Sequence, residues 1–261
     1  MKKAILMGLF ILLGAMQAPA SDVCFIAKEK DKVLKQEGDC KQRYSPCSTF
    51  KIPLSLMGYD HGTLVDAQKP LWEFRKGYAD DLDVWKQNHT PIMWMKNSCI
   101  WYSQLLTQRI GIDRFKAYVK RLSYGNQDVS GDVGKNNGLT NAWLDSSLAI
   151  SPLEQTEFLQ RMLDHKLHMI SPHAYHMTRS LLFADDLPDG WSLYGKTGSG
   201  RFHGWFVGWI EKDKRAIVFA THITDKAKMD TFPSARAKAA AKEKLLEIIQ
   251  PLTVCLNAPC S

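Results

Sequence analysis

The pattern of hydrophobic and polar positions changes twice along the chain. Residues 22–38 form two short runs around the turn Lys30-Asp31-Lys32, which predicts a pair of antiparallel strands. From Thr49 to about Leu182 most segments have helical spacing, including residues 101–122. After Pro188 the pattern changes to aromatic and β-branched runs separated by turns, which predicts antiparallel strands. These runs are Trp191–Lys196, Gly204–Glu211 and Arg215–Ile223.

Helix signals complete this pattern and indicate a fold class. Ser151-Pro152-Leu153-Glu154 combines a capping serine, a first-turn proline and a capping-box glutamate, and Ser171-Pro172 marks another helix start. Ala235–Gln250 predicts a terminal helix rich in Ala, Lys, Glu and Leu. The order predicts an α/β fold in which both chain ends form an antiparallel sheet flanked by helices, with an inserted all-helical region. The α/β part covers about 21–47 and 183–261, and the helical part covers about 48–182.

The first 20 residues have the composition of a secretory signal peptide. Lys2 and Lys3 precede the apolar run Ala4–Ala15, and Ala18-Pro19-Ala20 matches a cleavage site. At 12 residues the run is too short to span a bilayer. We therefore expect one exported unit, residues 21–261, with no membrane segment after cleavage and a periplasmic location.

Composition excludes several classes. The 261 residues are 45% hydrophobic and 23% charged, as in folded globular proteins. The formal charge of +7 falls to 7 − 2 = +5 without the two signal lysines, and no dense basic block suggests a nucleic-acid partner. Oligomeric state is left open.

Six cysteines follow the signal peptide, and an oxidising compartment permits disulfides among them. Cys24 and Cys40 flank the predicted strand pair, so we expect antiparallel strands to bring them together. No C-x-x-C or H-E-x-x-H spacing occurs, and we expect no metal site. The candidate disulfide cysteines are Cys24, Cys40, Cys47, Cys99, Cys255 and Cys260.

Ser48-Thr49-Phe50-Lys51 is the one Ser-x-x-Lys in the sequence. Residues three apart share a helix face, so the Lys51 amine can reach the Ser48 hydroxyl. A serine becomes a good nucleophile when a base takes its proton, and a lysine can be that base if its pKa is lowered or its amine is altered. Alone, the motif also fits a serine and a lysine on an ordinary solvated helix.

Lys196-Thr197-Gly198 ends a predicted strand and precedes Ser199. A cation and a hydroxyl on a strand edge can hold a carboxylate, and a glycine lets a ligand approach the backbone. Alone, this motif also fits a simple turn at the end of a strand.

Two further motifs, Ser98-Cys99-Ile100 and Tyr124-Gly125-Asn126, stand between these two, together with Trp143-Leu144. In this order the motifs resemble the class D serine β-lactamases, the oxacillinases. The resemblance extends to Gly204–Trp209 and covers essentially all of the chain after the signal peptide. It implies the β-lactamase/transpeptidase-like fold and hydrolysis of the β-lactam amide of penicillin-type antibiotics, which gives resistance.

The resemblance also implies roles for individual residues. Ser48 would attack the β-lactam carbonyl and form an acyl-enzyme, with Lys51 as general base in the form of an N-carboxylated lysine. No cofactor is implied except the carbon dioxide or bicarbonate that carboxylates Lys51. Trp143 would donate its indole N–H to the carbamate. Ser98 would relay a proton to the leaving nitrogen, and Lys196 would help hold the electrostatics of that step.

The same resemblance implies an oxyanion hole formed by the backbone N–H groups of Ser48 and Ser199. The residues implied to bind the substrate are Thr197, Gly198, Arg236 and Ile100. For Arg236, a plain arginine at the start of a helix is the alternative. Ile100 stands where the family has valine, and Cys47 and Cys99 each adjoin an active-site serine, which leads to the hypothesis of a Cys47–Cys99 bridge.

Other functions compete with this one. A penicillin-binding transpeptidase or carboxypeptidase shares S-x-x-K and K-T-G but normally has asparagine at the position of Ile100 and a membrane anchor. A β-lactam sensor domain is similar too, although such receptors have transmembrane helices. A periplasmic binding or structural protein would leave the ordered motifs unexplained. Which β-lactams are preferred stays open.

Overall fold

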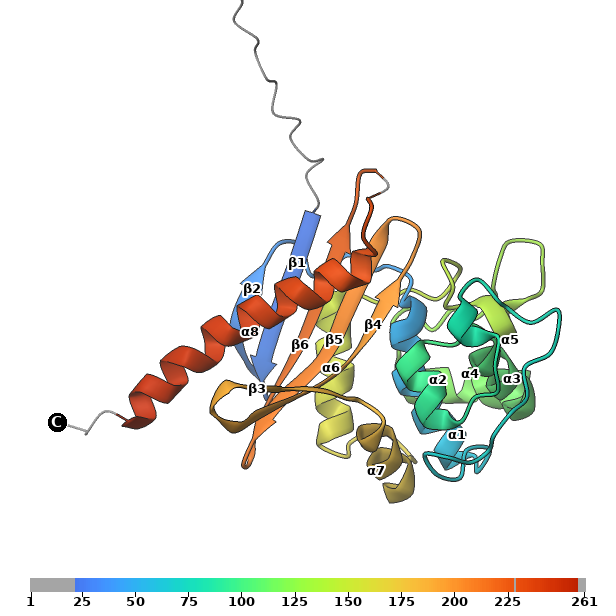
Figure 1. Cartoon of the computed structure of the whole chain (residues 1–261), viewed down its shortest axis with the longest axis horizontal. Helices are drawn as coiled ribbons and strands as arrows, with labels where there is room; N and C mark the ends of the chain where they lie inside the picture. The colour runs from blue at the N-terminus through green and yellow to red at the C-terminus, as the bar shows by residue number, and fades with distance from the viewer. Residues whose placement is uncertain (1–21, 228, 258–261) are drawn as a thin grey trace, which may run out of the picture.

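The sheet is formed by both ends of the chain. The computed structural model describes residues 22–227 and 229–257 (Figure 1). Six strands form an antiparallel sheet in the order β2-β1-β6-β5-β4-β3. They are β1 (Asp22–Glu29), β2 (Lys32–Glu37), β3 (Phe183–Leu187), β4 (Trp191–Ser199), β5 (His203–Lys212) and β6 (Arg215–Thr224). The predicted α/β class, with an antiparallel sheet, is confirmed.

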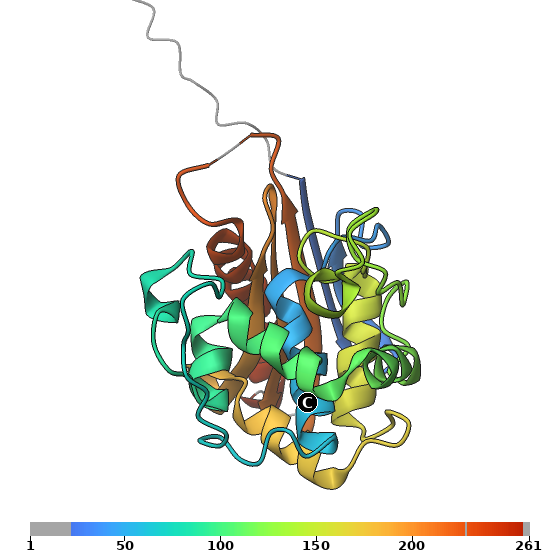
Figure 2. The same cartoon turned by 90° about the vertical axis from the view of Figure 1, so that its right-hand side faces the viewer.

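Seven helices lie between β2 and β3 in the sequence, and an eighth ends the described chain. The α-helices are α1 (Lys51–Asp60), α2 (Pro91–Asn97), α3 (Ile100–Ile110), α4 (Ile112–Arg121), α5 (Gly138–Asn141), α6 (Pro152–Leu163), α7 (Pro172–Ser180) and α8 (Pro233–Asn257). Three 3₁₀ turns are η1 (Cys47–Phe50), η2 (Asp83–Trp85) and η3 (Pro188–Gly190). Figures 1 and 2 show α8 across one face of the sheet, α6 across the opposite face, and the helices α1 to α5 gathered beside β4.

The central strands are buried on both faces, which explains their continuous hydrophobic runs. Along β5, Trp205, Val207 and Trp209 belong to the larger core, which the sheet shares with α1 to α7. On the opposite face of the strand, Phe206 and Ile210 belong to the core beneath α8. Since full burial of such a side chain stabilises a fold by about 1.5–3 kcal/mol, both layers depend on this strand.

The local helix signals are confirmed. At the start of α6, Ser151 Oγ accepts from the Glu154 N–H at 3.2 Å, and the Glu154 carboxylate accepts from the Ser151 N–H at 2.9 Å. Ser171 Oγ likewise accepts from the Ala174 N–H at the start of α7. The terminal helix is present and is longer than predicted, because α8 begins at Pro233 and extends to Asn257.

The predicted strand pair and its disulfide are also confirmed. β1 and β2 pair in antiparallel fashion, and Cys24 and Cys40 form a disulfide with Cα atoms 5.5 Å apart. Cys40 lies just beyond β2. The chain reaches it through Gly38, which has φ +71° and lies so close to the Val23 carbonyl that a side chain would collide with it.

Several expectations were wrong in detail. Residues 101–122 form two helices, because Gly111, with φ +83°, interrupts them between α3 and α4. The mainly helical stretch contains a long irregular segment, residues 61–90, whose helical part is η2 alone. Strand β3 was not predicted, since its polar sequence FADDL lacks a strand pattern.

The predicted signal peptide, residues 1–20, lies outside the described residues, and so do Cys260 and the side chain of Cys255. Within the described ranges no helix has the length and apolar character needed to cross a membrane.

Candidate active site

The Ser48–Lys51 motif lies at the junction of η1 and α1, next to β4. Thr49 holds the turn, because both its N–H and its hydroxyl donate to the Pro46 carbonyl, at 3.1 and 2.7 Å. The next turn then places Lys51 Nζ 3.3 Å from Ser48 Oγ, where the amine donates to the hydroxyl. The predicted contact between lysine and serine is therefore present.

Lys51 is fully buried, and this changes its protonation. Its exposed fraction is 0%, and burial lowers the pKa of its amine to about 8. Apolar neighbours in α1, Ile52 and Leu54, are buried with it. Among the described residues no carboxylate forms an ion pair with Lys51. A lysine in these surroundings is far closer to a neutral amine at pH 7 than a solvated one.

Ser98 and Lys196 form the second pair of the site. Ser98 ends α2 in the left-handed conformation, with φ +55°. Lys196, on β4, donates from Nζ to Ser98 Oγ and to the Thr197 carbonyl at 3.1 Å. Lys196 is 5% exposed, and burial lowers its pKa well below the usual value, with a further contribution from the charge of Lys51. The structure thus brings the first, second and last motifs together around two lysines.

Gly198 allows β4 to lie directly against the nucleophile turn. A Cβ at this position would lie 2.8 Å from the Pro46 carbonyl oxygen and 3.0 Å from the Thr49 nitrogen. Contacts this short are not tolerated, so the backbone of β4 can come this close only with glycine. The close neighbour of Gly198 in the structure is the Ser48 turn itself. Beyond it, Ser199 is exposed and donates from Oγ to Ser234 Oγ at 2.7 Å, which ties the end of β4 to the start of α8.

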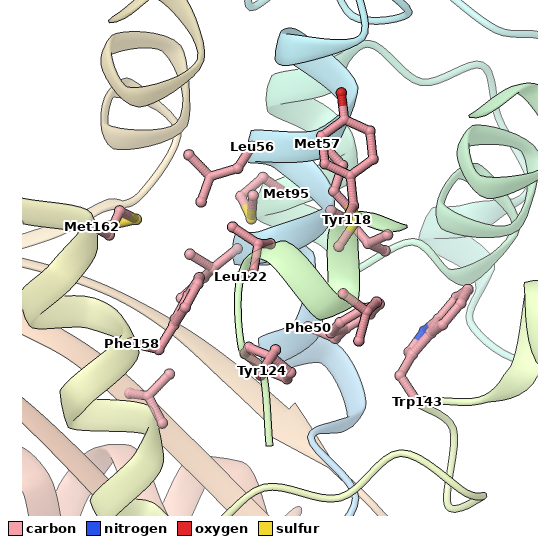
Figure 3. Packing of buried hydrophobic residues seen from close by; sticks show 14 of the residues in the cluster. Phe50, Leu56, Met57, Met95, Tyr118, Leu122, Tyr124, Trp143, Phe158 and Met162 are labelled. Atoms are coloured by element: carbon pink, nitrogen blue, oxygen red, sulfur yellow. The ribbon is translucent and has the colours of Figure 1, made fainter. Parts of the chain in front are cut away.

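Trp143 lies on the other side of the nucleophile turn (Figure 3). Its ring is buried and stacks on Phe50, with centroids 5.4 Å apart. Its carbonyl accepts from Ser45 Oγ at 2.8 Å. Since Phe50 directly precedes Lys51, Trp143 packs beside the segment that positions the buried amine.

The Tyr124-Gly125-Asn126 motif supports this arrangement from behind. Gln155 Nε2 donates to both Tyr124 OH and Thr49 Oγ1, each at 3.1 Å. Gly125 has φ +54°, and a Cβ there would lie 2.1 Å from the Ala149 carbonyl. Asn126 donates to the Ser147 carbonyl at 2.8 Å. The motif therefore joins the nucleophile turn to the loop that follows Trp143.

Arg236 and Ile100, two of the implied substrate-binding residues, are less directly placed. Arg236 lies in the first turn of α8 and forms an ion pair with the buried carboxylate of Asp225. Ile100 is half-buried at the start of α3 and packs against the main core. Their substrate-binding roles stay predictions.

A cavity of about 540 Å³ lies beside Lys196 and Thr197, between β4 and α2. Lys96 and Lys238 also line this cavity, so three lysines border it. Sequence reasoning missed these two residues, because neither belongs to a motif. The cavity is suited to an anionic ligand.

The hypothesis of a Cys47–Cys99 bridge is wrong. Both cysteines are free and buried. Cys47 has φ +48°, and its sulfur lies 3.4 Å from Asp145 Oδ1 and 3.8 Å from His203 Nε2. Cys99 is the N-cap residue of α3 and directly follows Ser98. We call the three side chains of Cys47, Asp145 and His203 the 47/145/203 cluster.

Comparison with known proteins agrees with the ordered motifs and the sheet. Residues 14–248 match the penicillin binding protein transpeptidase domain. The chain is 41% identical over 261 residues to β-lactamase OXA-9 of Klebsiella pneumoniae, covering 91% of this chain and 95% of that protein. The chain belongs to the class D serine β-lactamases.

Two further members of the family show the same relationship. β-Lactamase OXA-1 of Escherichia coli is 41% identical over 209 residues, or 77% of this chain and 74% of that protein. The crystal structure of the class D β-lactamase OXA-427 superposes with a TM-score of 0.83 at 43% identity, covering 88% of this chain and 99% of that one. The β-lactamase/transpeptidase-like fold expected for this class D chain is thereby confirmed.

Proposed function

We propose that this protein hydrolyses the amide bond of β-lactams through an acyl-enzyme on Ser48, and so gives resistance to penicillin-type antibiotics. The observation that carries the proposal is the 3.3 Å contact between Ser48 Oγ and the fully buried amine of Lys51. The similarity to proteins named β-lactamases supports the reaction class.

In the acylation step Ser48 Oγ attacks the lactam carbonyl and its proton passes to the base on Lys51. The carbon–nitrogen bond then breaks, and the leaving nitrogen takes a proton through Ser98, whose hydroxyl is held by Lys196. The backbone N–H groups of Ser48 and Ser199 would stabilise the oxyanion. Donors of this kind are worth about 3 kcal/mol each.

The base we propose is an N-carboxylated Lys51. Carbon dioxide reacts with a neutral amine, and burial makes that form accessible here by lowering the pKa of Lys51 to about 8. The carbamate would supply an anionic base that accepts the proton of Ser48 and later that of the hydrolytic water. Among the described residues no carboxylate forms an ion pair with the Lys51 amine, so forming the carbamate would break no ion pair. The buried Trp143 packs against Phe50, the residue before Lys51. Both features support the modification.

The substrate carboxylate would bind along β4. Thr197 and Gly198 follow Lys196 on this strand, and the adjacent cavity adds the positive charges of Lys96 and Lys238. Arg236, beside Ser234 at the start of α8, would approach the same carboxylate, and Ile100 would contact the apolar part of the substrate. We expect β-lactams as the ligands, with no nucleic-acid or membrane partner.

We further propose that residues 1–20 direct export to the periplasm and are removed. The Cys24–Cys40 disulfide is compatible with this, because disulfides persist in oxidising compartments. Amino-terminal sequencing of protein from the periplasmic fraction should give Ser21 as the first residue. Protein that keeps Met1 in the cytoplasm would contradict export.

The deciding experiment compares Ser48→Ala with the matched serine variant Ser192→Ala on a penicillin panel. Ser192 lies on β4 but bonds Asp186, away from the motifs. We expect Ser48→Ala to lose turnover and acyl-enzyme formation, and Ser192→Ala to keep both. Hydrolysis unaffected by Ser48→Ala would refute the mechanism. Stoichiometric acylation of the wild type without release would assign the chain to β-lactam sensing or transpeptidation instead.

A further inference from the structure

The 47/145/203 cluster has the composition and the spacing of a metal site. A thiol, a carboxylate and an imidazole are all ligands of Zn²⁺, and they come from three separate segments: the turn before Ser48, the loop after Trp143 and the start of β5. Their ligand atoms all lie within 4.8 Å of one another. No spacing rule could find them, because 98 residues separate Cys47 from Asp145 and 58 separate Asp145 from His203.

The distances agree with tetrahedral coordination. With Zn–S near 2.3 Å and Zn–N or Zn–O near 2.0–2.1 Å, two ligand atoms are about 3.6 Å apart for a sulfur–nitrogen pair and about 3.3 Å for a nitrogen–oxygen pair. In the structure Cys47 Sγ lies 3.8 Å from His203 Nε2, and His203 Nε2 lies 2.9 Å from Asp145 Oδ1. Side-chain shifts of a few tenths of an ångström would bring the cluster to ligand geometry.

Gly200 allows the backbone to lie directly against the cluster. A Cβ on Gly200 would lie 2.1 Å from His203 Nε2, 2.4 Å from His203 Cδ2 and 2.5 Å from Asp145 Oδ1. An alanine methyl group at this position would therefore displace the side chains of two ligands.

Neighbouring groups already hold the ligands as they are held in metal sites. His203 Nδ1 lies 3.1 Å from Nε2 of the buried His222, so the Nδ1–H can donate a hydrogen bond to His222 when His203 Nε2 binds a metal. The Arg201 N–H donates to Asp145 Oδ2 at 2.9 Å, which leaves Oδ1 for the ion. Partners of this kind fix the tautomer and orientation of metal ligands. The Arg201 guanidinium lies over the Phe202 ring instead of at the cluster.

We propose that Cys47 Sγ, Asp145 Oδ1 and His203 Nε2 bind one Zn²⁺ ion, with a solvent molecule as the fourth ligand. Binding replaces the Cys47 S–H by a sulfur–zinc bond and releases that proton to solvent. The Asp145 side chain is 43% exposed, so solvent can reach the fourth position. One of its ligands, Cys47, directly precedes Ser48, but the proposed metal site does not depend on the proposed hydrolysis.

The test uses untagged full-length protein, first stripped of metal by a chelator, and Co²⁺ as a spectroscopic substitute for Zn²⁺. We expect one Co²⁺ per chain with thiolate-to-metal charge-transfer absorption, displaced by one equivalent of Zn²⁺, and a higher Tm with Zn²⁺. Loss of a hydrogen-bond partner of a ligand costs roughly 10- to 100-fold in affinity, so Cys47→Ala and His203→Gln should cost more than about 100-fold.

Two variants make the result specific. Gly200→Ala removes no ligand but displaces the side chains of His203 and Asp145, so it should weaken binding while its circular dichroism stays that of the wild type. Cys99→Ala, the matched change at the other described free thiol, should bind as the wild type does. Absence of the charge-transfer band in the wild type would overturn the proposal, and so would a band that survives in Cys47→Ala.

Discussion

The pKa of Lys51 makes a quantitative prediction for reactivation by carbon dioxide. In the proposed mechanism, depletion of carbon dioxide removes the carbamate, which can reform only on the neutral amine. With a pKa of about 8, the neutral fraction is about 1% at pH 6, 9% at pH 7 and 50% at pH 8. A lysine of ordinary pKa would be about 0.03% neutral at pH 7, so burial raises the reactive fraction about 300-fold.

The assay measures the initial rate of recovery after depleted enzyme is mixed with a penicillin at a fixed concentration of dissolved carbon dioxide. The rate should rise about ninefold from pH 6 to 7, about fivefold from pH 7 to 8, and less than twofold above pH 8, because the amine is then mostly neutral. Lys51→Ala is the control and should show no recovery at any pH.

Two results would refute this reasoning. A rate that keeps rising tenfold per pH unit up to pH 10 would mean that the Lys51 pKa is not lowered. Full activity of depleted enzyme, with no response to bicarbonate, would mean that the base is not a carbamate.

Three further changes test how the site is held. Cys24→Ser opens a disulfide between residues 16 apart and should lower the free energy of unfolding in urea by about 3 kcal/mol with little change in kcat. Gly198→Ala places a methyl group against the Pro46 carbonyl, so it should cost about 1–3 kcal/mol in urea unfolding and lower kcat as β4 moves from the Ser48 turn. Gln155→Ala removes the amide that donates hydrogen bonds to Thr49 Oγ1 and Tyr124 OH, and it should cost about 1–3 kcal/mol by the same measurement.

Each of these changes has a contrary outcome. An unchanged urea midpoint for Cys24→Ser would show that the disulfide does not constrain the unfolded chain. Wild-type kcat in Gly198→Ala would separate the β4 contact from catalysis. A Gln155→Ala protein as stable as the wild type would mean that its two hydrogen bonds contribute nothing.

Local signals in the sequence predicted much of this molecule. The helix caps, the strand pair and the central strands depend on neighbours within a few residues, and the Ser48–Lys51 contact needs a single turn. Strand β3 was missed because an edge strand with little burial need not show a hydrophobic pattern. The orientation of Cys47 was missed for a different reason. Its sulfur contacts Asp145 and His203, which are remote in sequence. The position of Cys47 beside Ser48 in the sequence therefore could not show whether its sulfur faces Cys99.

The two buried lysines have a consequence for the stability of the whole enzyme. Without the proposed carbamate, Lys51 and Lys196 lie in the interior with no described carboxylate to neutralise them, and burial disfavours the charged form of both amines. The carbamate, or another bound anion, offsets this cost and shifts the folding equilibrium towards the native state. Replacing either lysine by an apolar side chain of similar size would therefore give a more heat-resistant protein that has lost its chemistry, which makes thermal selection alone a poor guide to improving this enzyme.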